Sequence, residues 1–164
     1  MAFFSKRIKF SFLNIIPVLL LFFLALNGTS TINLGFVSIN LHFILVYYYI
    51  LRKPQILGYG FIFLSGIISD VIFGLPLGIN ALALLSIASV AAYVRNVTVR
   101  INLLNDWISF IPAILFANFV YFLSLYFSNI PIDYLYLFKN SIFTFTFYPI
   151  LWAAFSFIGG LSQN

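Results

Sequence analysis

Long apolar runs separated by short polar breaks dominate this chain. Six runs predict helices that cross a membrane, because such a helix needs about 20 mostly apolar residues. They cover residues 10–26, 32–51, 55–73, 78–93, 107–127 and 140–157. The breaks carry turn-forming residues, as in NGTSTIN, GLPLG and SNIPIDY. Two runs are short, so five spanning helices with one re-entrant run are the alternative count.

The composition indicates that lipid is the main solvent. Hydrophobic residues make up 63% of the 164 residues and charged residues only 7%, too few to cover a soluble domain of this size. The sequence therefore predicts an all-α integral membrane protein, with a single polytopic domain over residues 1–164. The first run follows a basic segment but is long for a signal peptide and lacks a good cleavage site, which favours a retained first helix.

The basic residues predict the orientation of the helices. If the N-terminus is cytoplasmic and six helices alternate, seven of the eight Lys and Arg residues fall on the cytoplasmic side and only Lys139 falls outside. The seven are Lys6, Arg7, Lys9, Arg52, Lys53, Arg95 and Arg100. This asymmetry follows the positive-inside rule and predicts a multi-pass protein of a cytoplasmic membrane with both termini inside. Residues 47–49, three tyrosines before Arg52, predict an aromatic belt at the inner interface.

Several classes of partner and site are disfavoured. The basic residues are scattered between apolar runs and form no phosphate-binding stripe, so we expect no nucleic-acid partner. The chain has no Cys, no Glu and one His, which leaves almost no metal ligands, and we expect no cofactor. We expect the single histidine, His42, to be a hydrogen-bonded packing residue. The loop at residues 95–106 places Val97, Ile101 and Leu104 at helical spacing, which predicts an interfacial helix on anionic lipid, with a docking site for a partner as the alternative.

The third run carries the most informative pattern. Gly58, Ile62, Gly66, Asp70 and Gly74 follow at intervals of four, so they share one face of a helix. Small residues on such a face allow another backbone to approach closely. The fourth run has small residues of its own, and the five-residue turn GLPLG makes the two helices antiparallel neighbours.

Asp70 needs compensation for its charge, because a carboxylate inside a membrane is costly. Arg95 lies at the far end of the fourth run, about 25 Å away at the rise of an α-helix. Closer candidates are the N-terminal amides of the fourth helix, Asn80 and Lys139. Two hypotheses stay open: Asp70 ties down the hairpin, with Gly74, Pro76 and Gly78 shaping the turn, or it lies at a partner or ligand surface.

The segment RKPQILGYGFIFLSGIISDVIFGLPLGINALALL resembles the signature region of the rod shape-determining protein MreD family. Members of that family have a basic R(R/K)P element after the second span, a Gly-rich third span with an Asp, and then G-x-PLG followed by AL. The matching positions here are Arg52, Lys53, Pro54, Gly66, Asp70, Gly74, Pro76, Leu77, Gly78, Ala81 and Leu82. The match covers about a fifth of the chain, and GGLSQN departs from the family because it lacks the basic tail of many relatives.

The resemblance implies a non-catalytic inner-membrane scaffold subunit of the bacterial cell-elongation machinery, which makes peptidoglycan and sets rod shape. It would assemble with MreC and, directly or indirectly, with the MreB filament and the RodA–PBP2 synthase. It also implies a fold similar to the substrate-binding subunits of energy-coupling vitamin transporters. Gly66, Asp70, Gly74, Pro76 and Gly78 are then the structural or partner-facing residues.

The sequence also bears on two other classes of function, enzymes and small-molecule transporters. Enzymes fit poorly: Gly66, Asp70 and Gly74 give G-x3-D-x3-G where CDP-alcohol phosphatidyltransferases need a second acid, and Asp106 should lie at the opposite face from Asp70, which excludes the aspartate pair of a lipoprotein signal peptidase. The remaining alternative is a small-molecule transporter or its membrane-embedded substrate-binding subunit. Asp70, Asn118 and His42 are the polar groups that could line its cavity.

Overall fold

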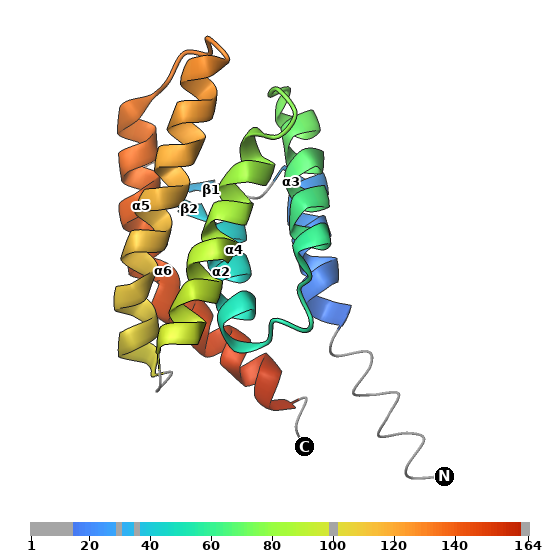
Figure 1. The fold of residues 1–164 in the computed structure, drawn as a ribbon, viewed down its shortest axis with the longest axis vertical. Coiled ribbons are helices and arrows are strands. Elements are labelled where there is room, and N and C mark those ends of the chain that lie inside the picture. Colours follow the sequence, from blue (N-terminus) through green and yellow to red (C-terminus); the bar gives the residue numbers. More distant parts are fainter. Residues whose placement is uncertain (1–14, 29–30, 35–36, 99–101, 162–164) are drawn as a thin grey trace.

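The computed structural model describes residues 15–28, 31–34, 37–98 and 102–161. It is a helical bundle with one small β-hairpin (Figure 1). In chain order the elements are helix Ile15–Leu26, strands β1 (Thr31–Leu34) and β2 (Val37–Asn40), and helices α2 (Leu41–Arg52), α3 (Tyr59–Phe73), α4 (Ile79–Val97), α5 (Leu103–Phe127) and α6 (Tyr134–Leu161). The predicted helical architecture is therefore present. Helix α3 begins later than expected, at Tyr59, whereas α5 and α6 begin earlier, at Leu103 and Tyr134.

The second predicted span is wrong in its first half. Residues 31–34 and 37–40 form two antiparallel strands, with Thr31 opposite Asn40 and Leu34 opposite Val37. Threonine, isoleucine and valine are frequent here, and β-branched residues favour strands. Asn40 then ends the hairpin and starts α2, because its Oδ1 accepts a hydrogen bond of 3.0 Å from the backbone N–H of Phe43. The hairpin is joined to α6 by the backbone N–H of Asn40, which donates to Thr144 Oγ1 at 2.8 Å.

Helix α2 is the core of the bundle. Every residue from His42 to Leu51 is buried, as expected for a helix that is apolar on all sides. Tyr47, Tyr48 and Tyr49 are 0%, 4% and 4% exposed, so the predicted aromatic belt at the membrane interface is wrong. These rings instead pack inside the protein, where Tyr47 lies 4.7 Å from the ring of Phe110 and Tyr49 lies 5.7 Å from that of Phe155, measured between ring centroids.

The helices differ in their ability to span a membrane. Among the described residues, α4 and α5 are long and apolar enough to do so, whereas helix Ile15–Leu26, α2 and α3 are apolar but shorter. Large apolar side chains are exposed along the outer faces of the bundle, for example Phe63 and Leu64 on α3 and Leu115 and Phe119 on α5. A soluble monomer rarely exposes apolar surface on this scale.

The connections lie at two ends of the bundle (Figure 1). The α3–α4 and α5–α6 turns share one end, which we call the turn end. Arg52 at the end of α2 and Arg95 at the end of α4 share the other, which we call the basic end, and there Arg95 Nη1 donates to the carbonyl oxygen of Ile50 at 3.1 Å. The predicted interfacial helix over residues 95–106 does not form in the described part, since residues 95–97 extend α4 and 103–106 begin α5; Ile101 lies outside the described residues.

Candidate functional site

The α3–α4 hairpin is closed by two glycines in the left-handed backbone region. Gly74 ends α3 with φ of 64° and Gly78 precedes α4 with φ of 109°. A side chain is disfavoured at both positions because of the clash between Cβ and the backbone. The Gly74 amide bonds back to the carbonyl oxygen of Val71, and the Leu75 amide to that of Asp70, which satisfies the last carbonyls of α3.

Asp70 joins the two helices from inside this turn. Its side chain is 0% exposed. Oδ2 accepts from the backbone N–H of Gly78 at 2.7 Å, and Oδ1 accepts from the backbone N–H and the side-chain Nδ2 of Asn80 at 2.8 and 2.9 Å. The expected compensation by the helix N-terminus and Asn80 is thus present, whereas Lys139 is exposed and takes no part in these bonds. The Asp70 carboxylate belongs to α3 but caps the N-terminus of α4.

Gly66 allows α3 and α4 to touch along their backbones. A Cβ at this position would lie 2.3 Å from Ala81 Cα and 2.6 Å from Ala81 N, well inside the distance at which real atoms pack. Gly66 and Ala81 are both buried. The predicted small face is therefore the contact surface between these two helices.

Four of the five predicted site residues act within the hairpin. Gly66 lies at the helix contact, Asp70 ties the turn, and Gly74 and Gly78 provide its backbone conformation. Pro76 is exposed at the tip, next to Leu77, which is 69% exposed. The tip is consequently the part of this motif that another molecule can reach.

A cavity of about 290 Å³ lies beside the hairpin at the turn end. Its walls come from β1, β2, α2, α4, α5 and α6, together with the end of α3 and the α3–α4 turn. Two of the three polar groups expected for a substrate cavity, His42 and Asn118, line it. Asp70 does not line it directly but is bonded to Asn80, which does.

His42 is mainly a packing residue, as expected. It is 2% exposed, and its Nε2 lies 3.0 Å from the carbonyl oxygen of Leu21. A carbonyl oxygen only accepts, so Nε2 carries the hydrogen. The bond attaches the helix Ile15–Leu26 to the start of α2.

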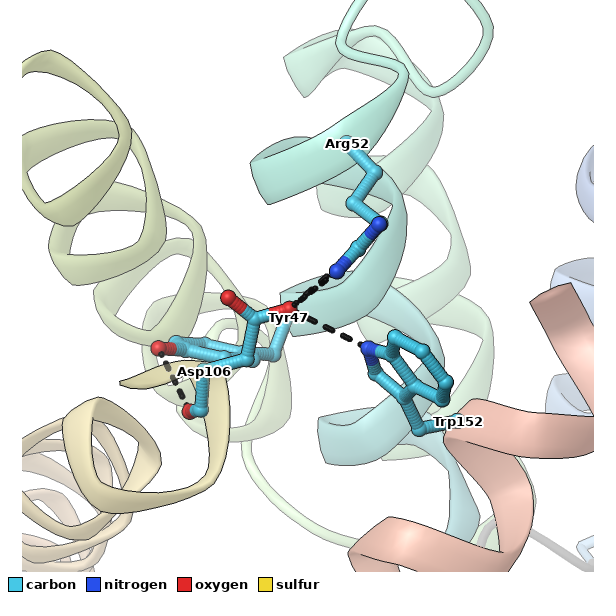
Figure 2. A network of polar contacts seen from close by, with 4 residues as sticks. All are labelled: Tyr47, Arg52, Asp106 and Trp152. Carbon is cyan, nitrogen blue, oxygen red and sulfur yellow. Dashed lines mark hydrogen bonds and ion pairs between the residues drawn. The ribbon is translucent and has the colours of Figure 1, made fainter. Parts of the chain in front are cut away.

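A second buried carboxylate organises the basic end (Figure 2). Asp106 is 2% exposed, and its Oδ2 accepts from Arg52 Nη2 at 2.8 Å, Arg52 Nε at 3.2 Å and Trp152 Nε1 at 3.1 Å. The guanidinium of Arg52 also lies over the Trp152 ring, 4.8 Å from its centroid. Tyr47 Oη donates to the backbone carbonyl of Asp106 at 3.3 Å.

This network links α2, α5 and α6, and it was not predicted from the sequence. The residues that its hydrogen bonds join are 46 to 59 positions apart in the chain, so no local pattern reveals it. The available signal was indirect: Asp106 is one of only three acids in the chain. A buried charge in such a chain needs a cation, and Arg52 was available at the same predicted side of the membrane.

The three carboxylates do not form a catalytic pair. Asp70 lies at the turn end and Asp106 at the basic end, as expected, and both accept several hydrogen bonds. Asp133 is exposed and caps the start of α6 by accepting from the Tyr136 amide at 3.0 Å. Within the described ranges, no three His, Asp or Glu residues gather in a way that could hold a metal ion.

No protein-family model, curated protein or solved structure matches this chain.

Proposed function

We propose that this chain is a non-catalytic scaffold subunit of the MreD type in the bacterial cell-elongation machinery. It would span the inner membrane and assemble with MreC, and through it or directly with the MreB filament and the RodA–PBP2 synthase. The observation that carries the proposal is the α3–α4 hairpin. Gly66, Asp70, Gly74 and Gly78 belong to the segment that resembles the family, and together they hold α3, the turn and α4 in place.

The contacts in the hairpin support a scaffolding role over a chemical one. Asp70 accepts three hydrogen bonds from the start of α4, and Gly66 lies directly against Ala81. A carboxylate so fully bonded and 0% exposed is poorly placed to move protons or bind metal. Its contribution is to hold two helices and the exposed tip at Pro76 and Leu77 in one geometry, which is what an assembly surface requires.

The surface of the bundle supports a membrane location. The apolar side chains exposed on α3, α5 and α6 are suited to lipid, and α4 and α5 are long enough to span it. We place the basic end in the cytoplasm because it carries Arg52, Lys53 and Arg95. The turn end, with Asp133 and Lys139, then faces the outside. A count of six passes requires strands β1 and β2 to cross the membrane together with α2 as one pass, since α2 alone has 12 residues.

Co-purification tests the proposal. The tagged chain is extracted from membranes of its own host, and the homologues of MreC, RodA and PBP2 are identified by mass spectrometry. We expect capture by the wild type and by Gly60→Leu, and loss of capture by Gly66→Leu. The two glycines lie on the same helix, but a Cβ at Gly60 meets nothing within 4 Å.

Depletion of the protein supplies an independent readout. Cells of a rod-shaped host should become round when it is depleted, and the wild type and Gly60→Leu should restore the rods. Rods that persist after depletion, together with failure to capture any of the three homologues, would show that the proposed function is wrong.

A further inference from the structure

The cavity at the turn end is polar without being charged. Among the residues that the structure describes, its lining contains no Asp, Glu, Lys or Arg, although Asp70 is bonded to the lining residue Asn80. Four asparagines reach it from four different elements: Asn40 from β2, Asn80 from α4, Asn118 from α5 and Asn140 from α6. Four amides therefore surround one space in a chain with few charged residues.

Each of the four amides uses one of its two ends in a hydrogen bond to a neighbouring residue. Asn80 Nδ2 donates to Asp70 and Asn118 Nδ2 donates to Ser141 Oγ at 2.7 Å, so both residues have a carbonyl oxygen to offer. Asn40 Oδ1 accepts from the Phe43 amide and Asn140 Oδ1 accepts from Thr144 Oγ1, so both have an amide NH₂ to offer. These bonds use Nδ2 of Asn80 and Asn118 and Oδ1 of Asn40 and Asn140, so the lining can offer at least two acceptors and at least two donors to a ligand.

The remaining lining suits a flat molecule. Phe43 and Phe73 contribute aromatic rings, and Tyr121 and Tyr136 add phenols. Rings provide faces for stacking, and a hydroxyl can either donate or accept. A cavity of about 290 Å³ is at the small end of the range for ligand pockets.

We propose that this cavity binds a small, uncharged, planar molecule with an amide or lactam edge. Such an edge carries a donor and an acceptor side by side, which matches the amides of Asn80 and Asn118 on one hand and of Asn40 and Asn140 on the other. An anion would find no Lys or Arg among the described lining residues to compensate its desolvation. Asp70 becomes a positioning residue, because it holds the Asn80 amide with its carbonyl oxygen free.

Binding in this cavity does not depend on the scaffold function. The cavity is the structural feature that favours the alternative function, a membrane-embedded substrate-binding subunit. A scaffold could carry such a site, and an empty cavity would leave the assembly role untouched. Capture of MreC reports on the scaffold, whereas equilibrium binding reports on the cavity, so failure of one is distinguishable from failure of the other.

The test uses purified full-length protein in detergent and equilibrium dialysis with nicotinamide, uracil and hypoxanthine. Nicotinate is the charged counterpart of nicotinamide with the same ring. We expect at least one of the three neutral compounds to bind, with nicotinate binding more weakly than nicotinamide. Absence of binding by all three, or nicotinate binding as tightly as nicotinamide, would overturn the proposal.

Variants locate the binding. Asn118→Leu should weaken it about tenfold or more through loss of a buried hydrogen bond, and Asn96→Leu, the same substitution at an exposed position of α4, should leave it unchanged. Tyr121→Phe removes only a hydroxyl and keeps the test valid if Asn118→Leu does not fold. Unchanged affinity in both cavity variants would place any bound compound elsewhere and contradict the proposal.

Discussion

Gly66 and Ala81 lie so close that the backbones of α3 and α4 are in direct contact. A methyl group on Gly66 would lie 2.3 Å from Ala81 Cα. Because the obstacle is backbone, neither a rotamer change nor a small side-chain shift relieves it. The spacing of the two helices, and with it the geometry of the turn, therefore depends on the absence of one side chain.

Gly66→Ala should destabilise the protein by about 1–3 kcal/mol, the usual cost of overpacking a well-packed contact. The measurement is the midpoint of thermal unfolding in detergent. Gly60→Ala is the matched control on the same helix, where the new methyl group meets nothing within 4 Å. Its midpoint should stay unchanged or rise slightly, since alanine favours a helix over glycine. Equal losses in both variants would contradict the close approach.

Asp70→Asn should destabilise the protein by about 2 kcal/mol. The substitution puts an NH₂ group in place of one of the two oxygens that accept from Gly78 and Asn80, so a buried donor loses its partner. Asp133→Asn serves as the control, because Asp133 is an exposed helix cap and asparagine caps a helix about as well as aspartate. Thermal unfolding of the two variants should differ clearly. A stable Asp70→Asn protein would show that the carboxylate is dispensable for the hairpin.

Loss of Arg52 should be costly because it leaves Asp106 buried without its cation. We expect Arg52→Met to destabilise the protein by up to about 3 kcal/mol, and the double variant Arg52→Met/Asp106→Leu to recover part of this loss. Lys139→Met, which removes an exposed cation, is the control. Comparing the thermal unfolding of the single and double variants separates two contributions to stability. One is the free-energy cost of the unpaired Asp106 carboxylate, and the other is the net stabilisation by the Arg52–Asp106 ion pair. A double variant less stable than Arg52→Met would contradict this account.

Thr144→Val tests the attachment of the β-hairpin to α6. Thr144 Oγ1 accepts from the Asn40 amide and donates to Asn140 Oδ1, and valine keeps the shape while losing both bonds. We expect a loss of about 1–3 kcal/mol because the partly buried Asn40 amide is left without its acceptor. Thr146→Val, two residues along on the exposed side, should have little effect. Unfolding monitored by hydrogen exchange should show the loss of protection concentrated in residues 37–52.

The orientation in the membrane can be measured with single cysteines, because the chain has none of its own. Leu77→Cys lies at the turn end and Asn96→Cys at the basic end, and both positions are exposed. In intact cells a membrane-impermeant maleimide should label the first and not the second, as the positive-inside rule predicts. Labelling of Asn96→Cys alone would invert the proposed topology.

The hairpin of α3 and α4 could be predicted because its information is local. Gly66, Asp70 and Gly74 recur at the helical period, and the turn residues follow at once in the chain. The partners of Asp70 lie 8 and 10 residues away, within reach of reasoning from helix geometry. Such contacts follow from spacing alone.

The core around α2 could not be predicted in the same way. Residues 32–51 are apolar almost throughout, and an apolar run does not distinguish strand from helix. The tyrosines before Arg52 fit an interface belt equally well until α4, α5 and α6 are seen to enclose them. The partners of Asp106 are decided by packing between distant segments, which no single stretch of sequence encodes.

The position of α2 has a consequence for biosynthesis. The chain emerges from the ribosome from its N-terminus, so residues 31–52 are made well before Thr144 and Trp152. Until α6 arrives, the Asn40 amide lacks Thr144 and the Arg52 side chain lacks Trp152. The centre of the protein is therefore completed only after α6 has been synthesised, and a nascent chain interrupted before α6 holds polar groups of its future core without these partners.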